Sequence, residues 1–321
     1  MAELPEAEEI NVVQLLEDCL SGKIDLICVL GPTASGKTRY AVRLAKEING
    51  LLEAKAVSDA SMTGKKAEIL SADSRQVYRG MDIGTGKDLD EYEDIAYHLI
   101  DIADAGAKYN IFEYQRDFET AYKAIRDRGN IPILCGGSGL YIEAATCGYS
   151  LPEVPADPQL RAELEKYDTD TLISRLAELK PLHNSTDYDT RKRLIRAIEI
   201  AVYEACHPAP RSRYLPKNTC YIGTLVSRDE RNRKIDRRLD SRIAEGMTDE
   251  VQRLLDSGVK PEELIYYGLE YKFVTLYLVG ELTFEQMRSQ LATSIHQFAK
   301  RQMTWFRGME RKGICIHWTK I

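Results

Sequence analysis

The sequence lacks any apolar run of the length that a membrane-spanning helix needs. Its best run, Phe273–Val279, is about a third of the roughly 20 residues that cross a bilayer. The first residues, MAELPEAEE, are acidic, whereas a secretory signal begins with basic residues and continues into a long apolar stretch. From these absences we expect a soluble, cytoplasmic protein.

The cysteines and histidines also lack the spacings that are typical of a disulfide framework or a metal site. Seven cysteines form an odd set with no CxxC pair, and the five histidines show no metal-ligand spacing. This pattern favours reduced, partly buried thiols over a disulfide framework or a zinc site. No internal repeat or low-complexity tract is present. The 321 residues, of which 44% are hydrophobic and 29% charged, predict a globular protein of one large or two smaller domains.

The charge is unevenly distributed along the chain. Residues 1–20 contain six acids and no base, which equals the whole net charge of −6. Residues 190–240 contain thirteen Lys and Arg against six acids, and residues 288–321 contain seven against one. Such basic stretches can neutralise the phosphates of a nucleic acid, although a charge run is more often a solvated helix face.

Alternating strand and helix patterns predict an α/β core with a parallel sheet covered on both faces. The predicted strands are Ile24–Leu30, Glu68–Ser74, His98–Ile102, Ile131–Cys135, Cys220–Val226 and Ile314–Trp318. Capping pairs at Asn110/Glu113 and Thr283/Gln286 predict helices that end near Gly129 and Arg307. Residues 51–66 lack periodicity and are predicted to form a surface loop or insertion.

The pattern also predicts a division into domains. A proline cluster at 152, 155 and 158 is followed by polar helical patterns, and HPAP at 207–210 closes that region. We therefore predict an acidic N-terminal extension at 1–22, an α/β core with C-terminal helices at 23–150 and 208–321, and an inserted all-helical subdomain at 151–207.

GPTASGKT, residues 31–38, fits the phosphate-loop pattern G-x-x-x-x-G-K-[ST] between a predicted strand and a predicted helix. Its backbone N–H groups, the helix N-terminus and a lysine form a cradle for a diphosphate, and a threonine hydroxyl can bind Mg²⁺. The residues concerned are Gly31, Pro32, Thr33, Ala34, Ser35, Gly36, Lys37 and Thr38. The motif leaves open whether the diphosphate belongs to a nucleotide.

Two further clusters follow predicted strands. In SADSRQVYRGMDIGTGK, residues 71–87, Asp73 is placed to face the cradle, as a general base or a water-mediated Mg²⁺ ligand; alternatively it caps a helix or pairs with Arg75. In CGGSGLY, residues 135–141, Ser138 can donate a hydrogen bond, and the alternative is a tight strand-to-helix turn.

These motifs, together with RKRLIRAIE and HQFAKRQMTWFRG and in this order, resemble the tRNA dimethylallyltransferase (tRNA isopentenyltransferase) family in its short bacterial form. The resemblance covers about Leu26 to Arg307. It implies a P-loop NTPase-like core and transfer of a dimethylallyl group from dimethylallyl diphosphate to the exocyclic amine of the adenine 3′ of the anticodon in certain tRNAs. In this family the phosphate loop holds the prenyl donor and not ATP.

The resemblance also implies roles for individual residues. Lys37, Thr33 and Arg238 would stabilise the leaving diphosphate, with Arg228 as a weaker candidate, and Thr38 would contact Mg²⁺. Asp73 would be the general base. The expected tRNA contacts, to an anticodon stem-loop, are Asp73, Ser74, Arg75, Gln76, Ser138, Arg161, Lys192, Arg193 and Arg196. We expect no membrane partner and a monomer.

The chain departs from the usual family pattern at several places, one of which is the 51–66 stretch that lengthens the gap between the phosphate loop and Asp73. Ser138 stands where threonine is more frequent, Lys234 stands where arginine is usual, and the glycine-tyrosine element reads YYGLEYK at 266–272. The competing interpretations are an adenylate isopentenyltransferase acting on free AMP, ADP or ATP, a small-molecule P-loop kinase, and a catalytically silent tRNA-binding protein.

Overall fold

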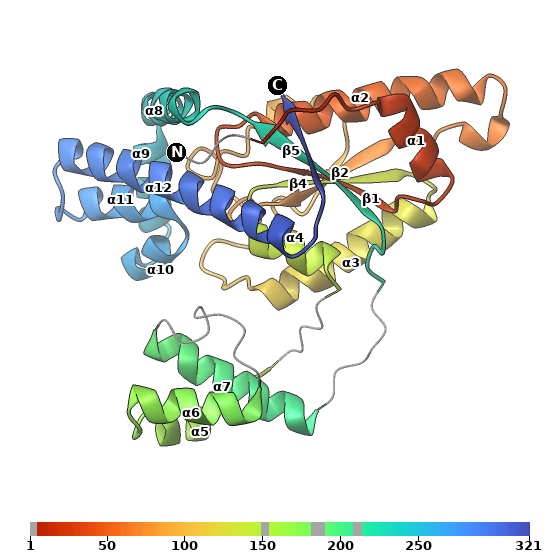
Figure 1. Ribbon diagram of the computed structural model, residues 1–321. Helices are drawn as coiled ribbons and strands as arrows, with labels where there is room; N and C mark the ends of the chain where they lie inside the picture. Colours follow the sequence, from red (N-terminus) through yellow and green to blue (C-terminus); the bar gives the residue numbers. More distant parts are fainter. Residues whose placement is uncertain (1–4, 149–153, 181–189, 208–213) are drawn as a thin grey trace. The chain divides into compact units, whose positions relative to one another are not determined.

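The computed structural model describes residues 5–148, 154–180, 190–207 and 214–321, which fall into two compact units. The first, here called the core unit, comprises Met1–Gly148 and Tyr214–Ile321, and the second, the helical unit, comprises Tyr149–Arg213. Figure 1 shows the helical unit in green. Within the described ranges no helix has both the length and the apolar composition needed to cross a membrane.

The core unit contains a six-stranded sheet in the order β3-β2-β4-β1-β5-β6. Its strands are β1 (Leu26–Leu30), β2 (Ala67–Ala72), β3 (Tyr97–His98), β4 (Ile131–Gly136), β5 (Thr219–Leu225) and β6 (Ile316–Lys320). All five strand pairings are parallel, which confirms the predicted sheet. Because β2, β4 and β1 are neighbours, the loops that follow these strands lie at one edge of the sheet.

Alternate residues of β1 explain why helices cover both faces of the sheet. Ile27 and Val29 pack with α1 (Val12–Leu20) and α2 (Lys37–Ala56). Leu26, Cys28 and Leu30 point to the opposite face and pack with its helices. Those helices are α3 (Ile111–Asp127), α4 (Gly139–Thr146) and the end of α12 (Phe284–Arg311) (Figure 1). Each face therefore has its own apolar core, as a parallel sheet requires.

The capping pairs determine where two helices begin. Asn110 and Glu113 form the predicted capping box of α3, and Thr283 and Gln286 form that of α12. Both predictions are confirmed, although α12 ends at Arg311, four residues later than expected. These reciprocal bonds satisfy N–H groups that have no partner within a helix.

A third apolar cluster joins the C-terminal helices to the segment that follows β2. The helices are α8 (Arg228–Ala244), α9 (Met247–Asp256), α10 (Pro261–Tyr266) and α11 (Leu269–Leu278), with α12 across them. Their buried side chains pack against Val77, Tyr78 and Met81. The cluster therefore holds the helices beside the loop that carries Asp73.

The prediction of a loop at 51–66 is wrong for its first part, because α2 continues to Ala56. Leu52 is fully buried one turn after Ile48, so the apolar stripe of α2 continues through a stretch that is otherwise small and polar. A short 3-10 turn, η1, follows at Ala60–Met62, and a second, η2, occupies Leu89–Tyr92.

The predicted strand at His98–Ile102 is also largely wrong, since β3 is only Tyr97–His98. Leu99 and Asp101 have positive φ angles of 66° and 55°, which break the extended backbone. The Asp101 N–H donates to the Gln76 carbonyl, and the Ile102 N–H donates to the Val77 carbonyl. The apolar residues are buried as expected, but in an irregular segment, and hydrophobicity alone does not separate these cases.

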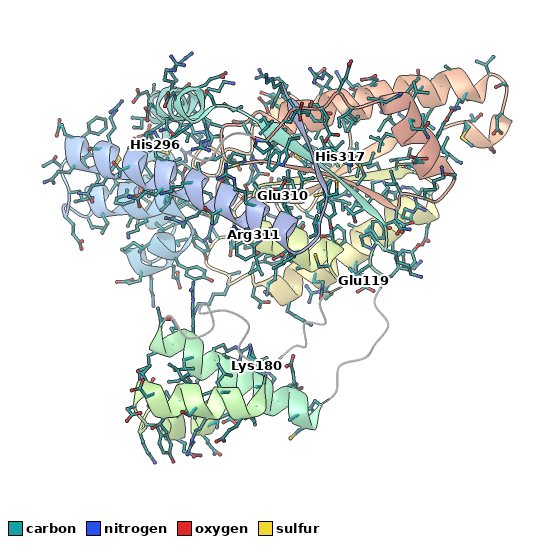
Figure 2. The ribbon with its side chains drawn as sticks, in the orientation of Figure 1. Glu119, Lys180, His296, Glu310, Arg311 and His317 are labelled. Atoms are coloured by element: carbon teal, nitrogen blue, oxygen red, sulfur yellow. The ribbon has the colours of Figure 1, made fainter. Side chains whose placement is uncertain are left out.

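The acidic N-terminal segment contains a helix that the sequence analysis did not assign. In α1, Leu16 is fully buried against α2, and the Glu17 carboxylate lies 3.8 Å from Lys55 Nζ of that helix. Ahead of it, the Glu8 N–H donates to the Trp318 carbonyl of β6 at 2.7 Å, and the Glu8 carboxylate lies 2.9 Å from His317 Nδ1 (His317 is labelled in Figure 2). This segment therefore covers part of the core unit.

The helical unit contains α5 (Pro158–Leu164), α6 (Thr169–Leu179) and α7 (Arg191–Cys206) around a core of leucine and isoleucine. Pro158 occupies the first turn of α5, where its missing N–H has no consequence. Of the residues used to predict its limits, positions 152 and 208–210 lie outside the described ranges.

Candidate active site

One cavity of about 660 Å³ opens at the sheet edge where β1, β2 and β4 end. It is lined by the phosphate loop, by the loops after β2 and β4, and by residues of α8, α10, α11 and α12. Seven Lys and Arg against four Asp and Glu line it. An excess of positive charge inside a hollow suits a polyanionic ligand.

The phosphate loop leads into α2 through a left-handed residue. Gly36 has φ +78° and caps α2 without a side-chain hydrogen bond, so the N–H groups of the first turn remain available to a ligand. Ala34, also with positive φ (59°), lines the cavity. Gly31, Pro32 and Ser35 do not line it, and the Ser35 hydroxyl instead accepts from Thr224 Oγ1 at 2.7 Å.

Lys37, Thr38 and Thr33 all line the cavity, as does Arg238 from α8. Arg238 Nη2 donates to Thr33 Oγ1, which joins α8 to the phosphate loop. Burial lowers the pKa of Lys37, and burial with the neighbouring Arg242 lowers the pKa of Arg238 to about 10. These four predicted diphosphate ligands therefore border one cavity, whereas Arg228 is exposed at the start of α8 and does not line it.

Asp73 lines the same cavity and also stabilises its own turn. Its Oδ1 accepts the backbone N–H of Arg75 at 2.9 Å, which closes a turn and does not cap a helix. The two roles are compatible, because a carboxylate has two oxygens and only Oδ1 is used for this turn.

The loops after β2 and β4 are bonded to one another. Ser138 Oγ accepts the N–H of Ser74 at 3.1 Å and lies 3.4 Å from Ser74 Oγ. Both residues line the cavity, as do Arg75 and Gln76. Gln76 is nearly buried, and its amide donates to the Gly86 carbonyl at 3.0 Å. Ser138 therefore fixes the turn that carries Asp73.

Gln302 of α12 is a site residue that the sequence analysis missed. Its Oε1 accepts the Thr33 N–H at 2.8 Å, and its Nε2 donates to the Gly137 carbonyl at 2.9 Å. A Cβ at Gly137 would lie 2.5 Å from this amide, so a side chain there would displace Gln302. The signal available was a polar residue on the apolar stripe that contains Ile295, Ala299 and Phe306.

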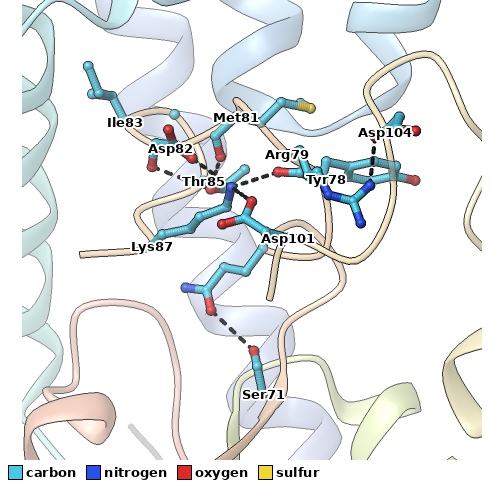
Figure 3. A network of polar contacts seen from close by, with 12 residues as sticks. Ser71, Tyr78, Arg79, Met81, Asp82, Ile83, Thr85, Lys87, Asp101 and Asp104 are labelled. Atoms are coloured by element: carbon cyan, nitrogen blue, oxygen red, sulfur yellow. Dashed lines mark hydrogen bonds and ion pairs between the residues drawn. The ribbon is translucent and has the colours of Figure 1, made fainter. Parts of the chain in front are cut away.

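A network of buried charges holds the segment that lines the far side of the cavity. The Glu250 carboxylate accepts the N–H groups of Asp82 and Ile83, each at 2.8 Å, and of Gly84 at 3.0 Å. Buried Lys87 donates to the Tyr78 carbonyl and to Asp82, each at 2.6 Å, and to Asp101 (Figure 3). The irregular segment 78–87 is thus fixed both by internal bonds of Lys87 and by bonds to Glu250 and Asp101 outside it.

Four of the predicted tRNA-binding residues lie in the helical unit. There, Arg161 contacts the buried Glu199 carboxylate through two bonds of 2.9 and 2.8 Å, and Arg196 contacts the same carboxylate. Lys192 and Arg193 are exposed near the start of α7. The structure therefore gives two of these arginines an internal partner and leaves two cations on the surface.

The sequence analysis also missed several other cavity residues. Tyr266, more than half exposed, has the Arg75 guanidinium 5.9 Å from its ring centroid, and exposed Phe298 lines the same cavity. Arg242 and Glu270 line it as well. Tyr266 and Glu270 lie in the quoted YYGLEYK segment and Phe298 lies in HQFAKRQMTWFRG, but neither motif indicated that these side chains line the cavity, because that depends on how the helices pack.

The oxygen ligands that suit a divalent cation lie around the phosphate loop. Thr38, Asp73 and Glu91 line the cavity, and hydroxyl and carboxylate oxygens are the ligands that Mg²⁺ prefers. In the part of the chain that the structure describes, no three His, Cys, Asp or Glu residues group as a metal cage. This donor set fits a cation held jointly with a phosphate ligand, as is usual for Mg²⁺.

Comparison with known proteins gives consistent results. The family model for IPP transferase matches residues 76–309. The chain is 53% identical to tRNA dimethylallyltransferase 2 of Bacteroides fragilis and 54% identical to tRNA dimethylallyltransferase 1 of Parabacteroides distasonis; in each case 92% of both chains is covered.

A solved tRNA isopentenylpyrophosphate transferase from Bacillus halodurans is 32% identical, with a TM-score of 0.62 over 92% of this chain and 89% of that one. A eukaryotic dimethylallyltransferase acting on tRNA has the same fold at 22% identity, with a TM-score of 0.66 over 87% of this chain and 69% of that one.

Proposed function

Because the chain belongs to the IPP transferase family, we propose that its cavity binds dimethylallyl diphosphate and presents it to the exocyclic amine of the adenine directly 3′ of a tRNA anticodon. Its relatives, more than half identical over most of the chain, are named tRNA dimethylallyltransferases, and the chain is therefore an enzyme that transfers a prenyl group to tRNA. These relatives do not favour the adenylate isopentenyltransferase. The donor, the acceptor atom and the residue roles are the parts proposed here.

The phosphate loop is the proposed site of the donor's diphosphate. The first-turn N–H groups of α2, the Lys37 ammonium and the Arg238 guanidinium converge on one space. When the bond between the allylic carbon and the diphosphate oxygen breaks, negative charge develops on the leaving diphosphate. Cationic donors already in place stabilise that charge more in the transition state than in the ground state, and so accelerate the reaction.

Thr38 and the diphosphate oxygens are the proposed ligands of Mg²⁺, with Asp73 and Glu91 within the same cavity for water-mediated contacts. When bound, Mg²⁺ supplies further positive charge against the leaving group. The oxygen donors around the phosphate loop fit this ion. The protein groups Lys37 and Arg238 act on the same oxygens independently of it.

Asp73 is the proposed general base. The exocyclic amine of adenine is a poor nucleophile, so removing its proton as the carbon–nitrogen bond forms lowers the barrier. In this step a bond forms between the amine nitrogen and the allylic carbon, and the diphosphate departs with the electrons of the broken carbon–oxygen bond. The amine loses one proton to the Asp73 carboxylate. The bond from the Arg75 N–H to Oδ1 fixes the orientation of this carboxylate.

The proposed tRNA contacts comprise one set of residues at the cavity and a second set on the helical unit. Ser74, Arg75, Gln76 and Ser138 would surround the target base, which an anticodon loop can present unstacked. In the helical unit, Lys192 and Arg193, together with the outer edges of Arg161 and Arg196, would contact backbone phosphates. We further propose that the enzyme acts as a monomer, in the cytoplasm where its tRNA substrates are.

The observation that carries this proposal is that the phosphate loop, Asp73 and the Ser74–Ser138 bond adjoin one cavity. The test is mass spectrometry of nucleosides from undermodified tRNA after incubation with labelled dimethylallyl diphosphate and Mg²⁺. We expect one labelled dimethylallyl group on adenosine. Label found only on AMP, ADP or ATP supplied in a parallel reaction would contradict the proposal and support the free-nucleotide enzyme.

A further inference from the structure

Two arginines one helical turn apart on α8 face the cavity together. Arg238 contacts Thr33 of the phosphate loop, and Arg242, which is 5% exposed, lies 3.2 Å from the Asp88 carboxylate through Nη2. Burial and the neighbouring Arg242 charge both lower the pKa of Arg238. A pair of this kind needs anionic compensation.

Glu270 is an acid beside this pair that the proposed reaction does not use. It is the second residue of α11, which begins after Gly268, and it lines the main cavity. It also lines a small adjoining hollow together with Arg238 and Arg242. Glu270 therefore borders both the proposed diphosphate cavity and the hollow that the two arginines line.

Burial and the neighbouring arginine charges have opposite effects on the pKa of the Glu270 carboxyl group. Burial raises the pKa of its carboxyl group, the Arg242 and Arg238 charges oppose that rise, and Asp73 adds to it. The charged groups on the other neighbouring elements have partners of their own. Glu250 of α9 is bonded to backbone N–H groups, Glu263 caps α10, and His296 of α12 lies 2.9 Å from Asp236 of α8.

Asp88 already pairs with Arg242, whereas, among the described residues, Arg238 bonds only to the neutral Thr33 hydroxyl. We infer that Glu270, beside both arginines, supplies the further negative charge that balances them in the free enzyme, and that a diphosphate bound there takes over this role, so that the Glu270 carboxylate takes up a proton from solvent. The inference rests on the proposed diphosphate site. It makes Glu270 a positioning residue, because it acts on the diphosphate through the two arginines.

The sign of the linkage follows from charge. A bound diphosphate brings negative charge next to Glu270 and occupies its cationic partners, so the pKa of the carboxyl group is higher in the complex than in the free enzyme. Binding therefore takes up a proton, and the affinity rises as the pH falls through the titration of Glu270. Glutamine at this position behaves like the protonated form at every pH.

The test is isothermal titration calorimetry of inorganic diphosphate with Mg²⁺ into the full-length protein, in buffers of different ionisation enthalpy. The slope of the observed enthalpy against the buffer enthalpy gives the number of protons taken up. We expect the wild type to take up more protons than Glu270→Gln, by up to about one per site. Protonation changes of the ligand itself are common to both proteins and cancel.

The second readout is the pH dependence of affinity. Above neutral pH, Glu270→Gln should bind diphosphate roughly tenfold more tightly than the wild type, and this ratio should fall towards one as the pH decreases. Asp240→Asn is the matched control, since Asp240 lies on α8 but pairs with the exposed Arg288. It should leave the proton count unchanged.

Equal proton counts for the wild type and Glu270→Gln would overturn the inference, as would weaker binding by Glu270→Gln at every pH. If glutamine prevents folding, Glu270→Asp keeps a titrating group and should retain the excess uptake. A wild type that binds no diphosphate would instead contradict the proposed function. A wild type that binds diphosphate without the excess uptake would contradict only the role of Glu270.

Discussion

Two pairs of arginines differ in how their charges are compensated. In the helical unit, Arg161 and Arg196 both bind the carboxylate of Glu199, which is 2% exposed. In the core unit, Arg238 and Arg242 face a cavity, and Glu270 also faces that cavity. An arginine that already binds a buried acid stabilises the fold, whereas buried arginines beside an open cavity can bind an anionic ligand. Substitutions at the two places should therefore affect different properties.

The largest expected effect is that of Asp73→Asn on catalysis. Turnover of tRNA should fall by about 10² to 10⁴, because asparagine cannot accept the proton of the amine. Its side-chain oxygen can still accept the Arg75 N–H, so the turn should be retained. Initial rates, tRNA affinity and thermal unfolding should be measured together. A variant with wild-type turnover would show that Asp73 only caps the turn.

Arg238→Gln should have the next largest effect, again on activity. We expect kcat/KM to fall about 10² to 10³, since one cationic donor to the developing diphosphate charge is removed. The free energy of unfolding should change little, because the substitution also relieves repulsion from Arg242. Lys234→Gln is a suitable control, since Lys234 lines the cavity but pairs with Glu230 at 2.9 Å. An equal fall of kcat/KM in the two variants would contradict a specific role of Arg238 in stabilising the leaving diphosphate.

Glu199→Gln should instead destabilise the helical unit. Hydrogen bonds from Arg161, the Asp157 N–H and Arg196 outweigh burial and lower the pKa of Glu199 to about 2, against an ordinary value of 4.5. Its stabilisation is therefore complete above the unfolded-state value and is lost as the pH falls from about 5 towards 2. Because the arginine side chains are 43% and 38% exposed, we expect a loss of roughly 2 kcal/mol at neutral pH.

Hydrogen exchange of α5 to α7 as a function of pH would measure this loss, because the unit unfolds locally at a free energy of its own. The wild type should lose protection against exchange as the pH falls, and Glu199→Gln should show no such pH-dependent loss. A variant whose exchange keeps the wild-type pH dependence would contradict the assignment of that dependence to Glu199.

The sequence predicted those parts of the site that lie in local motifs after strands. The phosphate loop, Asp73 and Ser138 each follow an apolar run, and parallel strands bring their carboxyl ends together, so that their proximity followed from the topology. The strand at 98–102 was wrong for the opposite reason. Its apolar residues are buried, but its backbone bonds to residues 76–77, and no local pattern encodes that partner.

Apart from Arg238, which the family resemblance supplied, the residues of the site that come from distant helices were not predicted. Gln302 and Thr33 are 269 residues apart, and their hydrogen bond depends on the packing of α12 over the sheet edge. Glu270 and Arg242 meet only because α11 and α8 adjoin the same hollow. Likewise, nothing in RKRLIRAIE indicates that Arg196 shares Glu199 with Arg161, since Arg161 lies on another helix.

The smallest expected effect is that of Lys192→Ala, which tests the surface of the helical unit. Lys192 is exposed near the start of α7, so its removal should leave thermal unfolding unchanged. If Lys192 contacts a tRNA phosphate, affinity should fall only a few-fold, and the slope of log affinity against log salt should decrease by about one. Lys166→Ala, another exposed lysine of the same unit, should leave that slope unchanged. Equal slopes in the two variants would mean that neither lysine contacts a phosphate, and the basic surface of α7 would then be solvated.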